Sequence, residues 1–452
     1  MRWLSLLLAA LVLSASRGQP APATSAPAQA SPAAPKALAD AIARWQDLRF
    51  GMFVHWGPVS LTGREIGWSR GAPTPVDEYD HLYERFNPVN FNADEWVRVA
   101  KAAGMKYLVF TTKHHDGFSM WDTAQSPYNI LRSPFRRDVV RELAEACQRG
   151  HIMFGAYYSI LDWYHPDYPL GSPSGKTRKP AADMDRYATF VRNQVTELVT
   201  RYAPLGILWF DGEWEEPWTD ARGSELYAHL RRLQPSLIVN NRVAKARKGM
   251  AGTSEAGQFP GDFDTPEQRV GGFNMDRPWE SCITICQQWS WKPDDTMKTL
   301  QESIRTLVGT VGGNGNLLFN VGPMPDGRIE PRQVARLAEI GAWLGRNGEA
   351  IYGTRGGPFV PGAWGASTRR DDRVFIHAFA WDGDTLRLPA LPAKVVSARR
   401  LNGGRVDVSQ EASGLTLRIR PAQLDPVDTV IVLEIDRPAI ALAPIPVPLK
   451  GR

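Results

Sequence analysis

The sequence predicts an α/β fold, a (β/α)8-like barrel, followed by a small C-terminal β-sandwich. Short apolar runs alternate with amphipathic helical patterns from Phe50 to Val321, which is typical of a parallel sheet with helical crossovers. After Tyr352 the pattern changes to short apolar runs at roughly ten-residue spacing, separated by Gly, Pro or Asp, which indicates an all-β domain. The length of 452 residues accommodates a barrel and one smaller domain.

The first residues have the pattern of an export signal. Arg2 supplies a positive charge, Trp3–Leu13 is apolar but too short to span a bilayer, and Ser14–Ser16 offers small residues for cleavage. We therefore predict a signal peptide over residues 1–18 and a flexible Ala/Pro-rich linker over residues 19–36. The mature protein is expected to be exported, periplasmic or secreted. No Cys follows the apolar run, so no stable membrane anchor is predicted.

The barrel is predicted over residues 37–352. Its candidate strands are Phe50–His55, Tyr107–Thr112, Ile152–Ser159, Gly206–Phe210, Leu237–Asn240, Cys282–Ile285 and Leu317–Val321. Amphipathic patterns between them predict helices over Ala93–Ala103, Val139–Arg149, Asp183–Tyr202 and Ser224–Leu233. Seven such repeats fit a barrel better than an open doubly wound sheet. No G-x-G-x-x-G opens a helix, so no dinucleotide-binding loop is predicted.

The β-sandwich is predicted over residues 353–437. Its candidate strands are Arg373–Ala380, Thr385–Leu388, Val395–Leu401, Leu415–Ile419 and Thr429–Glu434. Residues 438–452 are rich in Pro and are expected to form a loosely ordered tail.

Charge and composition argue against several classes of partner. The net charge of +5 is small for this length and includes no long Lys/Arg run, so no nucleic-acid partner is predicted. Three Cys are too few for a disulfide framework. The sequence gives no indication of the oligomeric state.

Polar and aromatic residues recur where successive candidate strands end. They are His55-Trp56, Lys113-His114-His115-Asp116, Tyr157-Tyr158, Asp211-Gly212-Glu213-Trp214 and Asn240-Asn241-Arg242. The carboxyl ends of barrel strands line the active site, so we expect these side chains to meet in one site. Taken singly, Asp211 could be a turn residue before Gly212. At the end of a buried strand it could instead be a nucleophile or base.

Seven segments, in order, resemble glycoside hydrolase family 29, the α-L-fucosidases. They are Gly51–Gly57, Thr111–Phe118, Gly155–Ser159, Leu208–Gly212, Asn240–Arg242, Asp264–Glu267 and Pro278–Glu280. The resemblance extends from Trp45 to Tyr352 and continues more loosely in the β-sandwich. It implies a distorted barrel and a retaining, exo-acting α-L-fucosidase. The implied substrates are fucosylated oligosaccharides or glycoconjugates, and no cofactor is implied.

The resemblance also implies a catalytic pair. Asp211 matches the family's nucleophile, and Glu267 matches the general acid/base of one branch of the family. A retaining glycosidase needs two carboxyl groups roughly 5 to 5.5 Å apart. Other carboxylates stay open as the acid/base, namely Glu213, Glu215, Glu216, Glu255 and Glu280, of which Glu280 is interpreted as a buried, supporting group.

Further residues match positions that contact the sugar in the family. They are His55, His114, His115, Tyr157 and Arg242. Glu65 and Trp68 correspond to a Glu-Trp pair that binds hydroxyls and packs on the ring, although the pair is adjacent in the family and separated here. Trp214 and Trp289 are predicted aromatic walls, with a core position as the alternative for Trp289.

The same residues are open to three other interpretations. A metal site at His114, His115 and Asp116 is disfavoured because consecutive side chains on a strand point to opposite faces, so no metal is predicted. A glycosidase of another specificity, for example for α-galactosides, would keep the two carboxylates and change the pocket. A catalytically silent glycan-binding protein is disfavoured by the presence of both Asp211 and Glu267.

Overall fold

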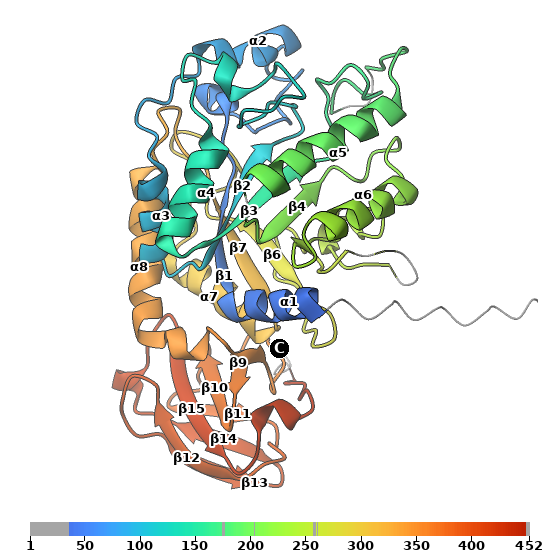
Figure 1. Ribbon diagram of the computed structural model, residues 1–452. Coiled ribbons are helices and arrows are strands. Elements are labelled where there is room, and N and C mark those ends of the chain that lie inside the picture. Colours follow the sequence, from blue (N-terminus) through green and yellow to red (C-terminus); the bar gives the residue numbers. More distant parts are fainter. Residues whose placement is uncertain (1–35, 174–176, 203, 256–258, 260, 449–452) are drawn as a thin grey trace, which may run out of the picture. The chain divides into compact units, whose positions relative to one another are not determined.

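The computed structural model describes residues 36–173, 177–202, 204–255, 259 and 261–448 (Figure 1). The predicted signal peptide and linker lie outside these residues, apart from Lys36, which begins the first helix. No helix in the described part of the chain is long and apolar enough to cross a membrane.

A parallel sheet of seven strands forms the centre of the larger domain and confirms the predicted fold class. The strands are β1 Phe50–Val54, β2 Tyr107–Lys113, β3 Met153–Ser159, β4 Ile207–Asp211, β5 Ile238–Val239, β6 Glu280–Thr284 and β7 Asn316–Val321. Their order in the sheet is β5-β4-β3-β2-β1-β7-β6. Each lies within two residues of its predicted bounds, because a run of buried apolar residues is easily found in the sequence.

The gap between β5 and β6 is filled by an irregular segment, residues 262–268, which we call the closing segment. Phe263 makes a parallel bridge to Asn240 beyond β5, and Glu267 makes one to Cys282 of β6. Backbone bonds join it to both neighbours, from the Asp262 N–H to Val239 and from the Cys282 N–H to the carbonyl of Pro266. The closing segment thus takes the place of an eighth strand and distorts the barrel.

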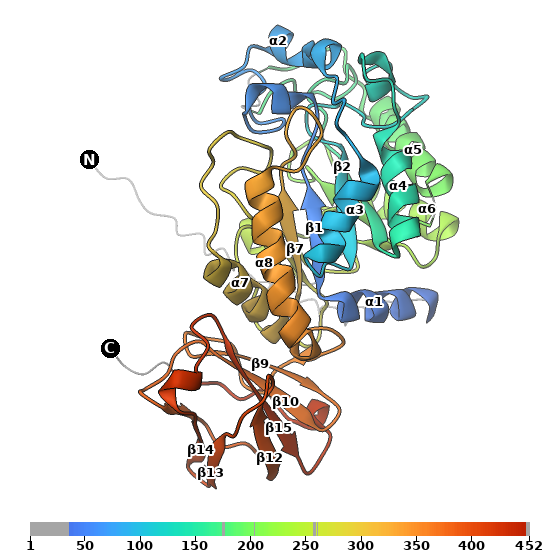
Figure 2. The ribbon, with the colours of Figure 1, turned by 90° about the vertical axis from the view of Figure 1, so that its left-hand side faces the viewer.

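Helices surround the sheet, along its outer face and at both ends of its strands (Figures 1 and 2). They are α1 Lys36–Leu48, α2 Val76–Asp80, α3 Ala93–Ala102, α4 Val139–Gly150, α5 Met184–Arg201, α6 Asp220–Leu233, α7 Leu300–Gly312 and α8 Pro331–Asn347. Short 3-10 turns occupy Pro58–Thr62, Leu82–Arg85, Ile130–Arg132, Gly249–Ala251, Gly348–Ala350, Pro421–Gln423 and Ala439–Ala441. The predicted helices begin after side-chain caps such as Asp138 and Asp183. Helices α1, α2, α7 and α8 were not predicted.

The C-terminal domain consists of two antiparallel sheets. The strands are β8 Arg355–Gly356, β9 Gly365–Arg370, β10 Arg373–Ala378, β11 Thr385–Leu388, β12 Val395–Arg400, β13 Asp407–Glu411, β14 Gly414–Arg418 and β15 Thr429–Ile435. One sheet has the order β12-β15-β10-β9-β8 and the other β11-β14-β13. Alternate side chains of β10, Val374 and Ile376, face the core between the sheets, as in a sandwich.

The larger sheet of the sandwich also packs on the barrel. Phe375 and Val432 belong to the hydrophobic core of the barrel. Arg305 of α7 donates hydrogen bonds to the carbonyls of Phe379 and Val427. Figure 2 shows α7 beside this sheet. The two domains therefore share one apolar core across α7.

The expectation of a loosely ordered tail is wrong for residues 438–448. Leu442 and Ala439 are buried in the sandwich core, and Ile445 makes a parallel bridge to Phe359. The buried guanidinium of Arg369 donates to the carbonyls of Ala439 and Leu442. Proline limits regular structure in this segment but does not prevent its apolar residues from covering the core.

We expect Leu442→Ala to lower the free energy of unfolding by about 3 kcal/mol, because it removes a buried side chain from a packed core. Ile440 is 53% exposed, so Ile440→Ala serves as the matched control and should change stability by less than about 0.5 kcal/mol. Urea unfolding followed by tryptophan fluorescence measures both. Equal, small effects would show that the tail contributes nothing to the core.

Candidate active site

The carboxyl ends of the barrel strands surround a cavity of about 320 Å³. Every predicted site residue lines it except Glu65. Tyr157 and Arg242 lie at its base and are only 1% exposed, whereas Trp68 and Trp214 are 43% and 40% exposed at its mouth. The cavity is therefore deep, polar at its base and aromatic at its entrance.

Asp211 ends β4 and points into the cavity. Its Oδ1 accepts a 2.6 Å hydrogen bond from Arg242, and its Oδ2 accepts a 2.9 Å bond from the hydroxyl of Tyr157. Burial alone would raise the pKa of Asp211, but the charge of Arg242, helped by that of Arg247, lowers it to about 2. Asp211 is therefore an ionised carboxylate with restricted motion, as a nucleophile requires.

Arg242 connects the two carboxylates of the cavity. One terminal nitrogen contacts Asp211, and the other lies 2.8 Å from Oε2 of Glu267. Its Nε donates to the hydroxyl of Thr265, and its guanidinium lies 4.5 Å from the ring centroid of Trp209. Since adjacent nitrogens of one planar group hold both carboxylates, Asp211 and Glu267 lie side by side, despite their separation in the sequence.

Glu267 differs from Asp211 in its access to solvent. It lies at the end of the closing segment, and its side chain is 18% exposed, against 11% for that of Asp211. Among the described residues that line the cavity, these two are the carboxylates. The pair thus consists of one deeply held carboxylate and one that can reach solvent.

His55 follows β1 and is held in one tautomer by Asn320. The amide nitrogen of Asn320 donates to the carbonyl of Trp289, so its oxygen faces His55 Nδ1 at 2.7 Å and must accept a proton from it. Burial lowers the pKa of His55 to about 3. The ring is therefore neutral, with Nε2 free to accept a hydrogen bond.

His115 is held in the same tautomer. The hydroxyl of Ser159 donates to the carbonyl of Leu161, so its oxygen accepts from His115 Nδ1 at 2.7 Å. The Nε2 of His115 lies 3.7 Å from Asp211, and burial lowers the pKa of His115 to about 4. His114 stacks on Tyr157, and its Nδ1 is buried without a partner among the described residues.

Trp68 and Trp214 form one aromatic wall at the mouth. Their ring planes are inclined by 11° with centroids 6.2 Å apart, and both rings meet His115 edge-on. Trp289 lies deeper, 4.7 Å from the ring of His55. Such flat rings suit the apolar face of a sugar.

Glu65 does not enter the cavity, contrary to its predicted role at a sugar hydroxyl. Its carboxylate accepts hydrogen bonds from the backbone N–H groups of Trp289 and Ser290, so it positions the loop that carries Trp289. Gly67 lies closer to the site than Glu65, with φ of 68° and space so limited that a Cβ would come within 2.9 Å of His114 Nδ1. Only glycine fits there without displacing His114.

Glu280 lies inside the barrel below the cavity, as interpreted from the sequence. It is fully buried and does not line the cavity. Its oxygens accept hydrogen bonds from Trp209 Nε1 at 3.0 Å and from the hydroxyl of Tyr107 at 2.5 Å. Burial raises the pKa of Glu280 to about 8. It supports Trp209 and closes the base of the cavity.

The other candidate acids also point elsewhere. Glu213 pairs with Arg247, and Glu215 accepts from Trp163 and Tyr168. Glu216 and Glu255 are exposed. None of these lines the cavity.

The cavity also contains residues that were not predicted, namely Phe53, Trp209, Arg247, Gly249, Met250 and Cys282. Phe53 and Trp209 could have been found, because each lies two positions before a predicted residue and shares its face of a strand. The bend of the loop after β5 brings Arg247 and Met250 to the cavity, and no sequence pattern marks it.

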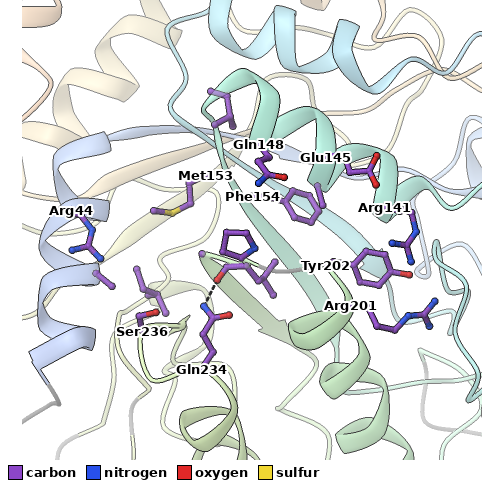
Figure 3. A pocket seen from close by; sticks show the side chains of 17 residues that line it. Arg44, Arg141, Glu145, Gln148, Met153, Phe154, Arg201, Tyr202, Gln234 and Ser236 are labelled. Carbon is purple, nitrogen blue, oxygen red and sulfur yellow. Dashed lines mark hydrogen bonds between the residues drawn. The ribbon is translucent and has the colours of Figure 1, made fainter.

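A second cavity, of about 470 Å³, lies at the opposite end of the barrel strands, beside α1 and α4 (Figure 3). Arg44, Arg141 and Arg201 surround it, and Glu145 is the one carboxylate among its described lining residues. It is larger, but it lacks a carboxylate pair and lies away from the strand ends where barrel enzymes act. The smaller cavity is therefore the candidate active site.

The described residues include no group of three or more His, Cys, Asp or Glu that could hold a metal ion. His55 and His115 instead contact Asn320 and Ser159.

A family model described as alpha-L-fucosidase matches residues 19–349. The chain belongs to the α-L-fucosidase family. The tissue alpha-L-fucosidase of Rattus norvegicus is 32% identical over 338 residues, which cover 69% of this chain and 70% of the rat protein. The plasma alpha-L-fucosidase of Homo sapiens is 30% identical over 365 residues, which cover 75% of this chain and 76% of the human protein. The predicted resemblance is confirmed.

Solved structures of α-L-fucosidases share the fold. Alpha-L-fucosidase isoenzyme 1 from Paenibacillus thiaminolyticus is 35% identical with a TM-score of 0.80, covering 89% of this chain and all of the other. A family 29 enzyme from Bacteroides thetaiotaomicron, trapped as a covalent intermediate with 2-fluoro-fucosyl fluoride, is 28% identical with a TM-score of 0.79, covering 88% of this chain and 96% of its own.

We expect Glu280→Gln to change how the stability of this α-L-fucosidase depends on pH. The folded-state pKa of about 8 lies above the ordinary value of 4.5, so the wild type loses stability as pH rises through this window and the unfolded chain releases its proton. The Gln side chain does not ionise, so the variant does not lose stability in this way. Its stability relative to the wild type should therefore increase by about 2 to 4 kcal/mol between pH 4.5 and pH 8.5.

Urea unfolding of both proteins across this pH range measures the difference. A constant difference would show that Glu280 titrates alike in the folded and unfolded states.

Proposed function

We propose that the protein is a retaining, exo-acting α-L-fucosidase in which Asp211 is the nucleophile and Glu267 the general acid/base. The observation that carries the proposal is the contact of both carboxylates with Arg242, 2.6 and 2.8 Å away, in the cavity that all three side chains line. This places them side by side, as a double displacement requires. Family membership supports fucose as the sugar.

In the first step, an oxygen of Asp211 attacks the anomeric carbon while Glu267 donates a proton to the leaving oxygen. The products are a glycosyl-enzyme ester and the free alcohol. In the second step, Glu267 takes a proton from water, which attacks the same carbon and releases Asp211. Tyr157 and Arg242 hold Asp211 in both steps through the hydrogen bonds described above. The greater exposure of Glu267 suits the group that exchanges a proton with solvent.

The cavity suits a terminal 6-deoxy sugar. His55 and His115 each offer a free Nε2 to a hydroxyl, because their Nδ1 protons are already donated. Phe53, Trp209 and Trp289 provide apolar surface for a methyl group. Since Glu280 and Trp209 close the base, only the end of a glycan can enter. The exo mode of action follows from this closed base.

We further propose fucosylated oligosaccharides or glycoconjugates as substrates and export to the periplasm or outside the cell. The aromatic mouth formed by Trp68 and Trp214 supports a carbohydrate leaving group. The charged start, apolar stretch and small residues of the first 16 positions support export.

We expect Asp211→Asn to lower kcat/KM on an aryl α-L-fucoside by at least about 10³-fold, because the uncharged amide cannot attack the anomeric carbon. The amide keeps the shape of the side chain and can still contact Arg242. Glu216→Gln, an exposed change five residues along the chain, is the control and should retain full activity. The same assays with an aryl α-D-galactoside test the other specificity, and equal hydrolysis of both sugars would contradict the fucose assignment.

We expect Glu267→Ala to affect substrates according to their leaving groups. A fucosylated disaccharide needs a proton on its leaving oxygen and should lose about 10³-fold in kcat/KM, whereas an aryl fucoside with an acidic phenol should lose far less. Azide should restore turnover of the aryl substrate and yield fucosyl azide, because a small anion can replace the activated water. An equal loss on both substrates without rescue would place the acid/base elsewhere.

A further inference from the structure

Arg247 lies in the wall of the cavity and gains or loses no proton or bond in the proposed steps. Its side chain is 6% exposed. Its Nε donates to Oε1 of Glu213 at 2.6 Å, and a terminal nitrogen donates to the carbonyl of Gly249. The same nitrogen lies 4.0 Å from Oε2 of Glu267, and the guanidinium lies 5.6 Å from the ring centroid of Trp214. Arg247 is thus held beside the acid/base by a neighbouring acid.

Glu213 is well suited to hold Arg247 but not to react. It follows Asp211 by two residues, is 2% exposed and does not line the cavity. Its second oxygen is buried with no hydrogen-bond partner among the described residues. A buried carboxylate of this kind costs stability unless a cation compensates it. Glu213 and Arg247 therefore depend on each other, and each offsets part of the other's charge.

Glu267 lies close to two guanidinium groups, Arg242 and Arg247. Other titratable groups near it are Tyr157 on β3 and Cys282 on β6, and Asp211 on β4 shares Arg242 with it. Nearby cations favour the carboxylate form of an acid. The first chemical step, however, needs the protonated form, so the charge that reaches Glu267 affects the rate.

We propose that Arg247 and Glu213 form a positioning pair, in which the Glu213 carboxylate fixes Arg247 beside Glu267 and limits the positive charge that Glu267 experiences. This inference rests on the proposed role of Glu267. Without Arg247, Glu267 would lose one of the two guanidinium groups that lie close to it. Without Glu213, the charge of Arg247 would act on Glu267 with no neighbouring carboxylate to offset it. The pair thus adjusts one carboxyl group to act first as an acid and then as a base.

The test is the pH dependence of kcat/KM for a fucosylated disaccharide, whose alkaline limb reports the acid of the free enzyme. Arg247→Met should move this limb up by about half a pH unit or more, and Glu213→Gln should move it down by about one unit. Arg247→Lys keeps the charge and should leave the limb within about 0.3 units of the wild type. A merely structural pair would lower activity in all three variants without shifts of opposite sign.

Arg231→Met is the matched control. Arg231 also pairs with a buried acid, Asp262, at 2.5 Å and lies over an aromatic ring, that of Tyr227 at 4.6 Å, but it is outside the cavity. The replacement of Arg231 should leave the alkaline limb of the pH profile at the pH of the wild type. Circular dichroism and thermal unfolding establish that each variant is folded. If Arg247→Met fails to fold, the downward shift of the limb in Glu213→Gln, against an unshifted limb in Arg247→Lys, decides.

The outcomes separate this inference from the proposed function. Unshifted limbs in Glu213→Gln and Arg247→Met would overturn the positioning pair. If Glu267→Ala still showed azide rescue in that case, the proposed acid/base would stand. A wild type that hydrolyses no fucoside would overturn both.

Discussion

The buried guanidinium of Arg242 is the contact on which the active site depends. A carboxylate at the end of a buried strand would ordinarily take up a proton, yet Arg242 keeps Asp211 ionised and lowers its pKa to about 2. The same group holds Glu267 beside it. Without this cation, the carboxylate of Asp211 would take up a proton, and the side chain of Glu267 would no longer be held beside it. One planar side chain therefore determines both the charge and the spacing of the proposed catalytic pair.

Arg242 can act in this way only because the barrel closes irregularly. β5 has only two residues. The chain turns beyond it, so the side chain of Arg242 points inward and extends from the end of β4 to the closing segment. That segment runs parallel to β5 and β6 and ends at Glu267. The distortion of the barrel is thus what brings Glu267 to Arg242.

The sequence was informative wherever a residue type and a strand end coincided. Asp211, His55 and Arg242 were predicted because strand ends in a barrel share one edge, and all three line the cavity. Glu65 was misplaced, because matching residue types could not show that its carboxylate is used by two backbone N–H groups. Arg247 was missed because its position depends on a loop whose course no periodicity reports. Prediction fails where irregular backbone, rather than strand alternation, sets the direction of a side chain.

The neutral histidines explain why the charges of the site are so strictly paired. Asn320 and Ser159 use the Nδ1 protons of His55 and His115, and burial keeps both rings uncharged, so neither can compensate Asp211. The positive charge must then come from arginines, which keep their protons even when buried beside acids. Two arginines beside Asp211 and Glu267 would favour the ionised form of both carboxyl groups, and an ionised group cannot donate a proton. A further carboxylate that balances one of the arginines offsets this effect. Glu213 meets this requirement without competing for the substrate, because it contacts Arg247 and not the cavity.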